Sequence, residues 1–420
     1  MNDELGAPDP NIQLMNIKPK RKLNLKVIIV VLILIVLLVV VIALLLKTRQ
    51  NKTPSSSITE TTTGTGNEIN SNRLRVIATG DMIPHDSLNA NAKQDNGYDY
   101  LQFMKNMQKY FELADVRFCN QAVLGAGEKY GITGYPVFNS PTEFSRDMQK
   151  VGCNLINTGS NHTNDKTQDV IDASVAVWDG LPNILAVAGA NRSTEEMQKV
   201  RTFEVKGVKF AFLSYTTYSN TPGKNSYGLT LYSEEFAKKQ LSEAKAKADI
   251  IIVSMRWGTE YSDQINATQN SQSQFLADNG ADIVLGHGPH ILQPVKKLKA
   301  KSGKSTYVWY SLGNFLNAQL EATGLINGFA VMDIDTQSKT ITDVGYLPTY
   351  VHYEWTQAQK AREDLLARKN FSMHLLEDSD ELIAKSQLGT SVDEQTKRIR
   401  SILNKHTSVD ILSEEQYLAN

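Results

Sequence analysis

An uninterrupted apolar run near the N-terminus constrains this chain more than any other feature of its sequence. Val27 to Leu46 are 20 consecutive residues drawn only from Val, Ile, Leu and Ala. At about 1.5 Å per residue, a helix of this length spans roughly 30 Å, the thickness of the bilayer hydrocarbon. A cleaved signal peptide fits less well, because the run exceeds the usual apolar length and no small-residue cleavage site follows it. The run predicts one transmembrane signal-anchor helix over residues 27–46.

Basic residues around the run predict which side of the membrane each part of the chain occupies. Before it lie Lys18, Lys20, Arg21, Lys22 and Lys26, and after it in the near flank come Lys47, Arg49 and Lys52. The positive-inside rule therefore places residues 1–26 in the cytoplasm and the C-terminal part of the chain outside the cell. Residues 47–72 are rich in Ser and Thr, which predicts a flexible linker with a reach of roughly 25 to 30 Å. The expected localisation is the cell membrane, with a single pass.

Charge and cysteine content exclude several classes of protein. The chain has 44 Lys and Arg against 45 Asp and Glu. The first 72 residues contain 8 of the basic and 5 of the acidic residues, so the rest of the chain has 36 basic and 40 acidic residues, a formal net charge of −4. No basic field therefore favours a nucleic acid as partner. The only two cysteines, Cys119 and Cys153, exclude a disulfide-rich scaffold and a thiolate zinc finger. We expect them to be buried free thiols, with a disulfide between them as the alternative.

The remaining chain alternates short β-type runs with segments of helical spacing. Examples of the runs are 74–79, 209–215, 249–255 and 282–285, and examples of the helical segments are 141–151, 169–180 and 234–247. This order predicts an α/β fold with largely parallel central strands. Residues 351–420 carry helical spacing with opposite charges four apart, which predicts a small helical appendage at the C-terminus.

Polar residues of the kind that bind metals or substrates follow these strands. Four of the seven histidines, His85, His162, His287 and His290, stand in such clusters together with Asp81 and Asn161. In α/β sheets, ligands bind at the carboxyl ends of the strands, so the clusters are expected to converge on one edge. Each histidine taken alone is explained as a hydrogen-bonded loop residue. Taken together, the set is typical of a Zn, Fe or Mn site.

The ordered motifs resemble a known family. GDMIPHDS, ADVRFCNQ, GYPVFNSP, NTGSNHTND, RWGTEY, GHGPHILQP and YSLGNF, between about residues 73 and 350, look like the bacterial CapA/PgsA family of capsule and poly-gamma-glutamate synthesis proteins. The resemblance implies a metallophosphatase-like β-sandwich flanked by helices on both faces. It also implies a role in the synthesis, export or anchoring of an anionic envelope polymer, beside other membrane proteins of capsule or polyglutamate synthesis. Fold alone does not establish chemistry.

The resemblance also assigns roles to individual residues. It implies metal ligands at Asp81, His85, Asn161, His287 and His290. His162 would serve as an acid or hydrogen-bond donor, and Asp165 would orient a histidine. Glu260 follows the W-G pair of its motif, and Asn314 is expected to form a structural turn. The cofactor expected is one divalent metal, Mn, Fe or Zn, or none.

Departures from the family pattern fall inside this expected site. Gln121 stands where the family usually has the Glu of an N-x-E type motif, and Arg256 stands where the family has a His before W-G. A guanidinium cannot ligate a metal. The favoured hypothesis is therefore a degenerate site that binds an anion through Arg256, Gln121 and Glu260. The alternatives are an active metal-dependent phosphoesterase or amide hydrolase, and a plain salt bridge between Arg256 and Glu260.

Overall fold

The computed structural model describes residues 72–419, and it shows a mixed α/β sandwich of two large sheets. The predicted transmembrane helix at 27–46 and nearly all of the predicted linker lie outside the described residues. Among the helices of the described part, none is long and apolar enough to cross a membrane.

The larger sheet has eight strands, with parallel pairing at its centre. Its order is β15 (Lys369–Leu375), β14 (Thr340–Glu354), β13 (Ile326–Asp335), β1 (Arg73–Met82), β4 (Val116–Gln121), β5 (Leu155–Asn157) and β6 (Ala186–Ala188), and β16 (Asp410–Ile411) pairs with β14. Strands β1, β4, β5 and β6 are parallel. The pairs β1–β13, β13–β14 and β14–β15 are antiparallel, and β16 is parallel to β14. The polar residues that follow the parallel strands therefore lie at one edge of this sheet.

The second sheet has six strands and also a parallel centre. Its order is β11 (Val295–Lys299), β12 (Ser305–Trp309), β10 (Ile283–His287), β9 (Ile250–Arg256), β8 (Val208–Thr216) and β7 (Arg201–Val205). Every residue of β9 and β10 is buried, which explains why these strands read as continuous apolar runs rather than as alternating patterns. A separate small hairpin joins β2 (Lys93–Gln94) to β3 (Gly97–Tyr98).

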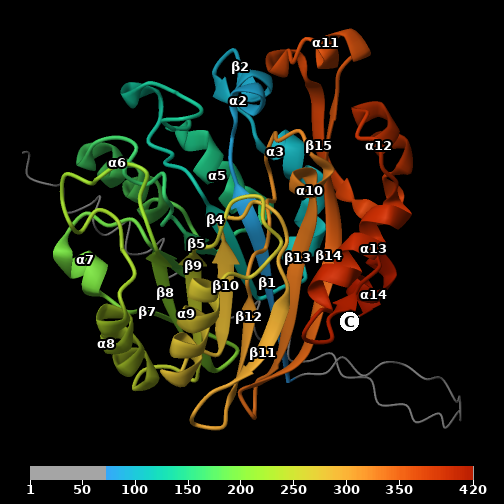
Figure 1. The fold of residues 1–420 in the computed structure, drawn as a ribbon. Coiled ribbons are helices and arrows are strands. Elements are labelled where there is room, and N and C mark those ends of the chain that lie inside the picture. The colour runs from blue at the N-terminus through green and yellow to red at the C-terminus, as the bar shows by residue number, and fades with distance from the viewer. Residues whose placement is uncertain (1–71, 420) are drawn as a thin grey trace, which may run out of the picture. The chain divides into compact units, whose positions relative to one another are not determined.

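The inner faces of the two sheets pack on each other and helices cover their outer faces (Figure 1). Phe118 of β4 meets Phe212 of β8 edge-on, with ring centroids 6.0 Å apart. Leu241 and Leu276 pack on the outer face of the six-stranded sheet. The longer helices are α5 (Thr142–Val151), α6 (Gln168–Asp179), α8 (Glu234–Lys245) and α9 (Ala267–Asp278), and the shorter ones are α2 (Asp86–Ala92), α3 (Leu101–Met104), α4 (Gln108–Glu112), α7 (Thr194–Gln198) and α10 (Ala322–Leu325).

The C-terminal region is more than the helical appendage expected from its sequence. Helices α11 (Gln357–Ala361), α12 (Asp380–Ser386), α13 (Val392–Leu403) and α14 (Glu414–Ala419) are present, but β15 and β16 join the larger sheet. In β15 the buried Phe371, Met373 and Leu375 alternate with more exposed residues. This strand pattern is short and lies between longer charged segments with helical spacing. The sequence therefore predicted helices for the whole region.

The two cysteines form a disulfide, so the expectation of two free thiols was wrong. Cys119 lies in β4 and Cys153 stands just before the neighbouring strand β5, with 5.8 Å between their Cα atoms. In the register of β4 with β5, Cys119 stands opposite Ile156, so Cys153 reaches Cys119 from the turn before β5 and not as its strand partner.

Candidate functional site

Six strands of the two sheets end in polar residues that meet at one end of the sandwich. Asp81, Asn120 and Asn157 come from the larger sheet, and Ser214, Arg256 and His287 come from the smaller one. All six are buried. The structure thus brings together side chains that are up to about two hundred positions apart in the sequence.

Asp81 is the buried carboxylate at the centre of this cluster. Its Oδ1 accepts a hydrogen bond from Asn120 Nδ2 at 2.5 Å, and its Oδ2 lies 2.8 Å from His290 Nδ1. Burial alone would raise the pKa of Asp81, but the hydrogen bond and charge of His290 outweigh it and lower the pKa. Asp81 therefore keeps its negative charge without exposure to solvent.

A glycine places the Asp81 backbone. A Cβ atom on Gly80 would lie 2.1 Å from the carbonyl oxygen of Gly313, so only glycine allows this close approach. The contact lets Asp81 N donate to Gly313 O and lets Phe315 N donate to Asp81 O. It also brings Asn314 to the site, although a structural turn was the only role expected for that residue.

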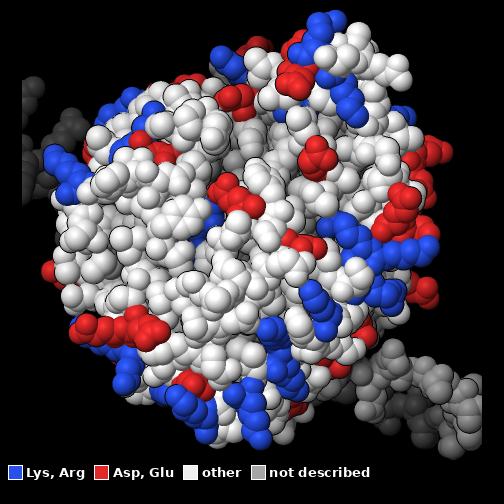
Figure 2. All heavy atoms as spheres, in the orientation of Figure 1, with Lys and Arg blue, Asp and Glu red and all other residues white. Residues whose placement is uncertain are grey.

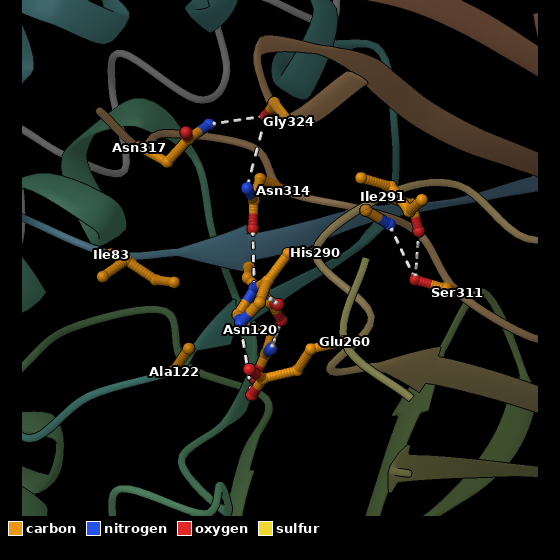
Figure 3. A network of polar contacts seen from close by, with 12 residues as sticks. Ile83, Asn120, Ala122, Glu260, His290, Ile291, Ser311, Asn314, Asn317 and Gly324 are labelled. Carbon is orange, nitrogen blue, oxygen red and sulfur yellow. Dashed lines mark hydrogen bonds and ion pairs between the residues drawn. The ribbon is translucent and has the colours of Figure 1, made fainter. Parts of the chain in front are cut away.

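His290 joins Asp81 to Asn314. Its Nδ1 lies 3.1 Å from Asn314 Oδ1 as well as 2.8 Å from Asp81 Oδ2. Because both neighbours are acceptors, Nδ1 carries the hydrogen. Figure 3 shows His290 between Asn314 on one side and Asn120 and Glu260 on the other. Its Nε2 faces Glu260 Oε1 at 3.9 Å.

A chain of uncharged side chains links Asp81 to the second sheet. Asn157 Nδ2 donates to Asn120 Oδ1 at 2.6 Å, and Ser214 Oγ donates to Asn157 Oδ1 at 2.5 Å. Sequence analysis did not select these three residues. A sequence signal for Asn120 and Asn157 exists, because each lies at the end of a buried strand. Amides at strand ends are common, however, so this position alone does not identify them as site residues.

Arg256 occupies the middle of the site on the side of the smaller sheet. Its side chain is 3% exposed, and its Nε donates to Asn161 Oδ1 at 2.9 Å. Its Nη2 donates to Tyr218 Oη at 3.0 Å and to Glu260 Oε1 at 3.1 Å. The expected pairing of Arg256 with Glu260 is therefore present, but the guanidinium is buried rather than on the surface.

Gly288 lies directly against the Arg256 guanidinium. A Cβ atom on Gly288 would lie 1.8 Å from Arg256 Nη1, and Gly288 has a φ of +109°. The guanidinium thus fills the volume that a side chain at position 288 would need. A side chain at 288 would force the Arg256 side chain to move, a coupling that the sequence alone does not reveal.

His287 is fully buried and uncharged. Its ring stacks on Phe118 at 5.4 Å, and its Nε2 lies 2.8 Å from Ser254 Oγ. Burial, assisted by the charge of Arg256 and opposed by Asp81, lowers the pKa of His287 to about 4. Its Nδ1 has no hydrogen-bond partner among the described residues.

His162 and Asp165 form a pair beside Arg256 and Asn161. His162 Nδ1 lies 2.7 Å from Asp165 Oδ2, and that carboxylate also accepts a hydrogen bond from the backbone N–H of Phe138. The carboxylate thus fixes the orientation of the ring. The His162 side chain is 17% exposed, and its Nε2 faces Asn220 at 3.4 Å.

Two of the expected residues do not contribute a free side chain to the site. His85 Nδ1 lies near the backbone at Ile83 O and Ala318 N, and burial lowers its pKa to about 4. The assignment of Gln121 as an anion-binding residue was wrong. Its Oε1 accepts from Ser145 and Trp178, so it packs under the helices.

The error at Gln121 is one of register. Successive residues of a strand point to opposite faces, so Asn120 faces the site and Gln121 faces away from it. In an N-x-E pattern that begins at Asn120, the third position is Ala122. Its carbonyl accepts a hydrogen bond from Ser160 Oγ. The negative charge that the pattern supplies is therefore absent at this position.

The arrangement does not fit the metal centre that the family resemblance implies. The Asn161 oxygen, an expected ligand, is held by the Arg256 guanidinium, and Asp81 Oδ1 accepts a hydrogen bond from Asn120. Within residues 72–419, Asp81 Oδ2 and His287 Nδ1 are the expected ligand atoms that are buried without a hydrogen-bond partner, and Asp81 Oδ2 lies 2.8 Å from His290 Nδ1. Across residues 72–419, the one group of three His, Cys, Asp or Glu side chains close enough to share an ion is the exposed Glu377, Asp378 and Glu414 cluster, outside this site. A guanidinium beside a dication would add like-charge repulsion.

Comparison with known proteins identifies the family. The model described as bacterial capsule synthesis protein PGA_cap matches residues 75–319, so the chain belongs to this family, as its motifs predicted. It is 31% identical over 173 residues to the PGA biosynthesis protein CapA of Bacillus subtilis (strain 168), covering 40% of this chain and 44% of that protein.

A second relative is also a CapA protein, and it too is matched over only part of its length. The chain is 27% identical over 213 residues to the capsule biosynthesis protein CapA of Bacillus anthracis, covering 46% of this chain and 49% of that protein. The match thus spans about half the length of each curated relative. Among solved structures, a novel phosphatase from Mycoplasma pneumoniae aligns with a TM-score of 0.43 at 13% identity, over 66% of this chain and 93% of that one. That likeness is too distant to bear on function.

Proposed function

We propose that this chain is a membrane-anchored extracellular protein that acts in the synthesis, export or anchoring of an anionic capsule or poly-gamma-glutamate polymer. Membership of the capsule synthesis family and the names of the two Bacillus relatives support this role. The apolar run at 27–46 supports the anchor. Other capsule or polyglutamate synthesis proteins in the same membrane are the expected partners. The fold is taken to be metallophosphatase-like, with its metal site altered for binding.

The observation that carries the binding role is the contact of Arg256 with Glu260. Arg256 is almost fully buried, and within residues 72–419 the one carboxylate in ion-pair contact with it belongs to Glu260, a side chain that is 43% exposed. A charge-assisted hydrogen bond in a desolvated place is stronger than one in water. The site therefore already accommodates a carboxylate of the kind that poly-gamma-glutamate repeats along its length.

A direct binding measurement tests this proposal. Purified full-length protein is titrated with fluorescently labelled poly-gamma-glutamate, and Arg256→Gln is compared with the native chain. We expect a loss of affinity of roughly 30-fold, about 2 kcal/mol, because a buried charge partner is removed. Arg75→Gln is the matched control, since Arg75 is also 3% exposed but pairs with Asp333 far from the site. Equal affinities in all three proteins would contradict the proposal.

A second candidate function is an active phosphoesterase or amide hydrolase, and the His162–Asp165 pair favours it. A histidine held by a carboxylate and partly open to solvent is suited to general acid catalysis. Metal analysis of the full chain, combined with a phosphodiester assay, separates the candidates. Stoichiometric Mn, Fe or Zn, with turnover lost in Asp81→Ala, would favour the hydrolase over a site used only for binding.

A further inference from the structure

A cavity lined in part by lysines lies at the opposite end of the sandwich from Arg256. It has a volume of about 280 Å³, and three of its lining side chains are Lys297, Lys304 and Lys339. Ile250, which begins β9, and Asp282, which precedes β10, also line it. Since Arg256 and His287 end the same two strands, the cavity and the candidate site lie at opposite ends of the smaller sheet.

The contacts of the three lysines leave their charge largely unbalanced. The Lys297 ammonium lies 5.1 Å from the centre of the Tyr307 ring, and Lys339 Nζ donates to the carbonyl of Gly207 at 2.9 Å. Lys304 Nζ lies 4.0 Å from Asp282 Oδ1. Asp282 is the one carboxylate among the residues that line the cavity, against three lysines, and burial raises the pKa of its carboxyl to about 6. The cavity has an excess of positive charge although the domain is acidic overall.

This cavity adjoins the place where the chain enters the domain. Lys206 Nζ donates to the carbonyl of Arg73, the first residue of β1, and Lys339 binds the residue next to Lys206. Figure 2 shows Lys and Arg side chains gathered along the lower edge of the molecule, where Figure 1 places the β11–β12 hairpin. We call Lys206, Lys297, Lys299, Lys304 and Lys339 the lysine face.

We propose that the lysine face binds the phosphate headgroups of an anionic phospholipid surface, with one headgroup in the 280 Å³ cavity. The inference rests on the membrane anchor of the proposed function. The predicted linker is attached at this end and has a reach of roughly 25 to 30 Å, so it allows contact with the bilayer. Lysines attract an anionic leaflet within about one Debye length, roughly 8 to 10 Å. The domain would then present the Arg256 end away from the membrane.

Chemical labelling of the full-length protein tests the lysine face. The chain is placed in nanodiscs of phosphatidylcholine alone or with phosphatidylglycerol, and the rate of acetylation by a water-soluble reagent is measured by mass spectrometry. We expect Lys297, Lys299 and Lys304 to react at least about fivefold more slowly in the anionic discs. Lys369 and Lys385, which line a cavity with Trp355 elsewhere, should react equally in both discs.

Different failures of this experiment have different meanings. A chain that enters neither kind of disc contradicts the anchor itself. A chain that enters both but shows equal rates at Lys297 and Lys304 overturns the headgroup site alone. Protection produced by inorganic phosphate in phosphatidylcholine discs would assign the cavity to free phosphate. Protection produced there by soluble poly-gamma-glutamate would assign it to the polymer, and each of these two results overturns a lipid site.

Variants complete the test. In the triple variant Lys297→Ser, Lys304→Ser and Lys339→Ser, the protection of Lys299 by phosphatidylglycerol should be lost. A matched triple variant removes the same charge elsewhere, by Lys360→Ser, Lys369→Ser and Lys385→Ser. In this variant the protection of Lys299 by phosphatidylglycerol should remain. Persistent protection of Lys299 in the first triple would overturn the role of the cavity.

Discussion

The two ends of the sandwich differ in whether their charged side chains are buried or exposed. At the carboxyl ends of the strands, Arg256 and Asp81 are buried among amides, hydroxyls and histidines. At the amino ends, the lysine face is largely exposed around a cavity with one carboxylate. A desolvated charge selects its partner by geometry, whereas exposed lysines act over distance and are screened by salt. Under the two proposals, the first end would recognise a carboxylate by geometry and the second would hold the domain to a lipid surface by charge.

The disulfide gives the largest expected effect, and it lies on a strand that extends from one end of the sandwich to the other. Strand β4 carries Asn120 at the site end, and Asp115 just before it pairs with Lys206 of the lysine face. Replacing Cys119 and Cys153 by alanine opens a bond across a sequence separation of 34. We expect the free energy of unfolding to fall by about 3 kcal/mol in chemical denaturation. A loss below about 1 kcal/mol would mean that sheet packing alone holds β4.

The coupling of Arg256 with Gly288 gives the next largest effect and is confined to the site end. Gly288→Ala forces a Cβ against the guanidinium and strains a backbone with φ of +109°. We expect it to cost about 3 kcal/mol of stability in the native chain and about half of that in an Arg256→Ala background, where only the backbone strain remains. Thermal or denaturant unfolding of the four proteins measures the difference. Equal costs in both backgrounds would show that Arg256 does not fill the space at 288.

The two ends should also respond oppositely to acid. His287 has its pKa lowered to about 4 by burial, so between pH 6.5 and 4 only the unfolded chain binds the proton, and stability falls as the pH falls. Asp282 has its pKa raised to about 6 by burial, so the folded chain takes up the proton first, and stability rises as the pH falls through 6.

Single variants separate these two contributions. We compare the decrease in the free energy of unfolding between pH 7 and pH 5. For His287→Gln we expect this decrease to be about 1 to 2 kcal/mol smaller than for the native chain. For Asp282→Asn it should be about 1 kcal/mol larger, because the stabilising protonation of Asp282 no longer occurs. Denaturant unfolding at several pH values measures both slopes. Parallel slopes in all three proteins would contradict opposite titration at the two ends.

The sequence predicted the family, the alternation of strands with helices and the polar strand ends, because each depends on local pattern. The sequence did not predict which side chains of a strand face the site. Asn120 and Gln121 are adjacent, and only the register of β4 decides which of them meets Asp81. The Cys119–Cys153 bond, and the fit of Arg256 against Gly288, depend on distances between segments. A single sequence does not contain these distances.

The smallest expected effect distinguishes local from bulk charge at the Arg256 end. Glu260 is the carboxylate that a polymer carboxylate must displace, so Glu260→Gln should raise the affinity for poly-gamma-glutamate by about three- to fivefold. Because the Arg256 contact is buried, this ratio should persist at high salt, whereas lysine-face protection should disappear there. Glu243→Gln, which removes a surface carboxylate paired with Lys247, is the matched control and should leave affinity unchanged. A gain of equal size in both variants, or one that vanishes with salt, would mean that net charge rather than the buried guanidinium governs binding.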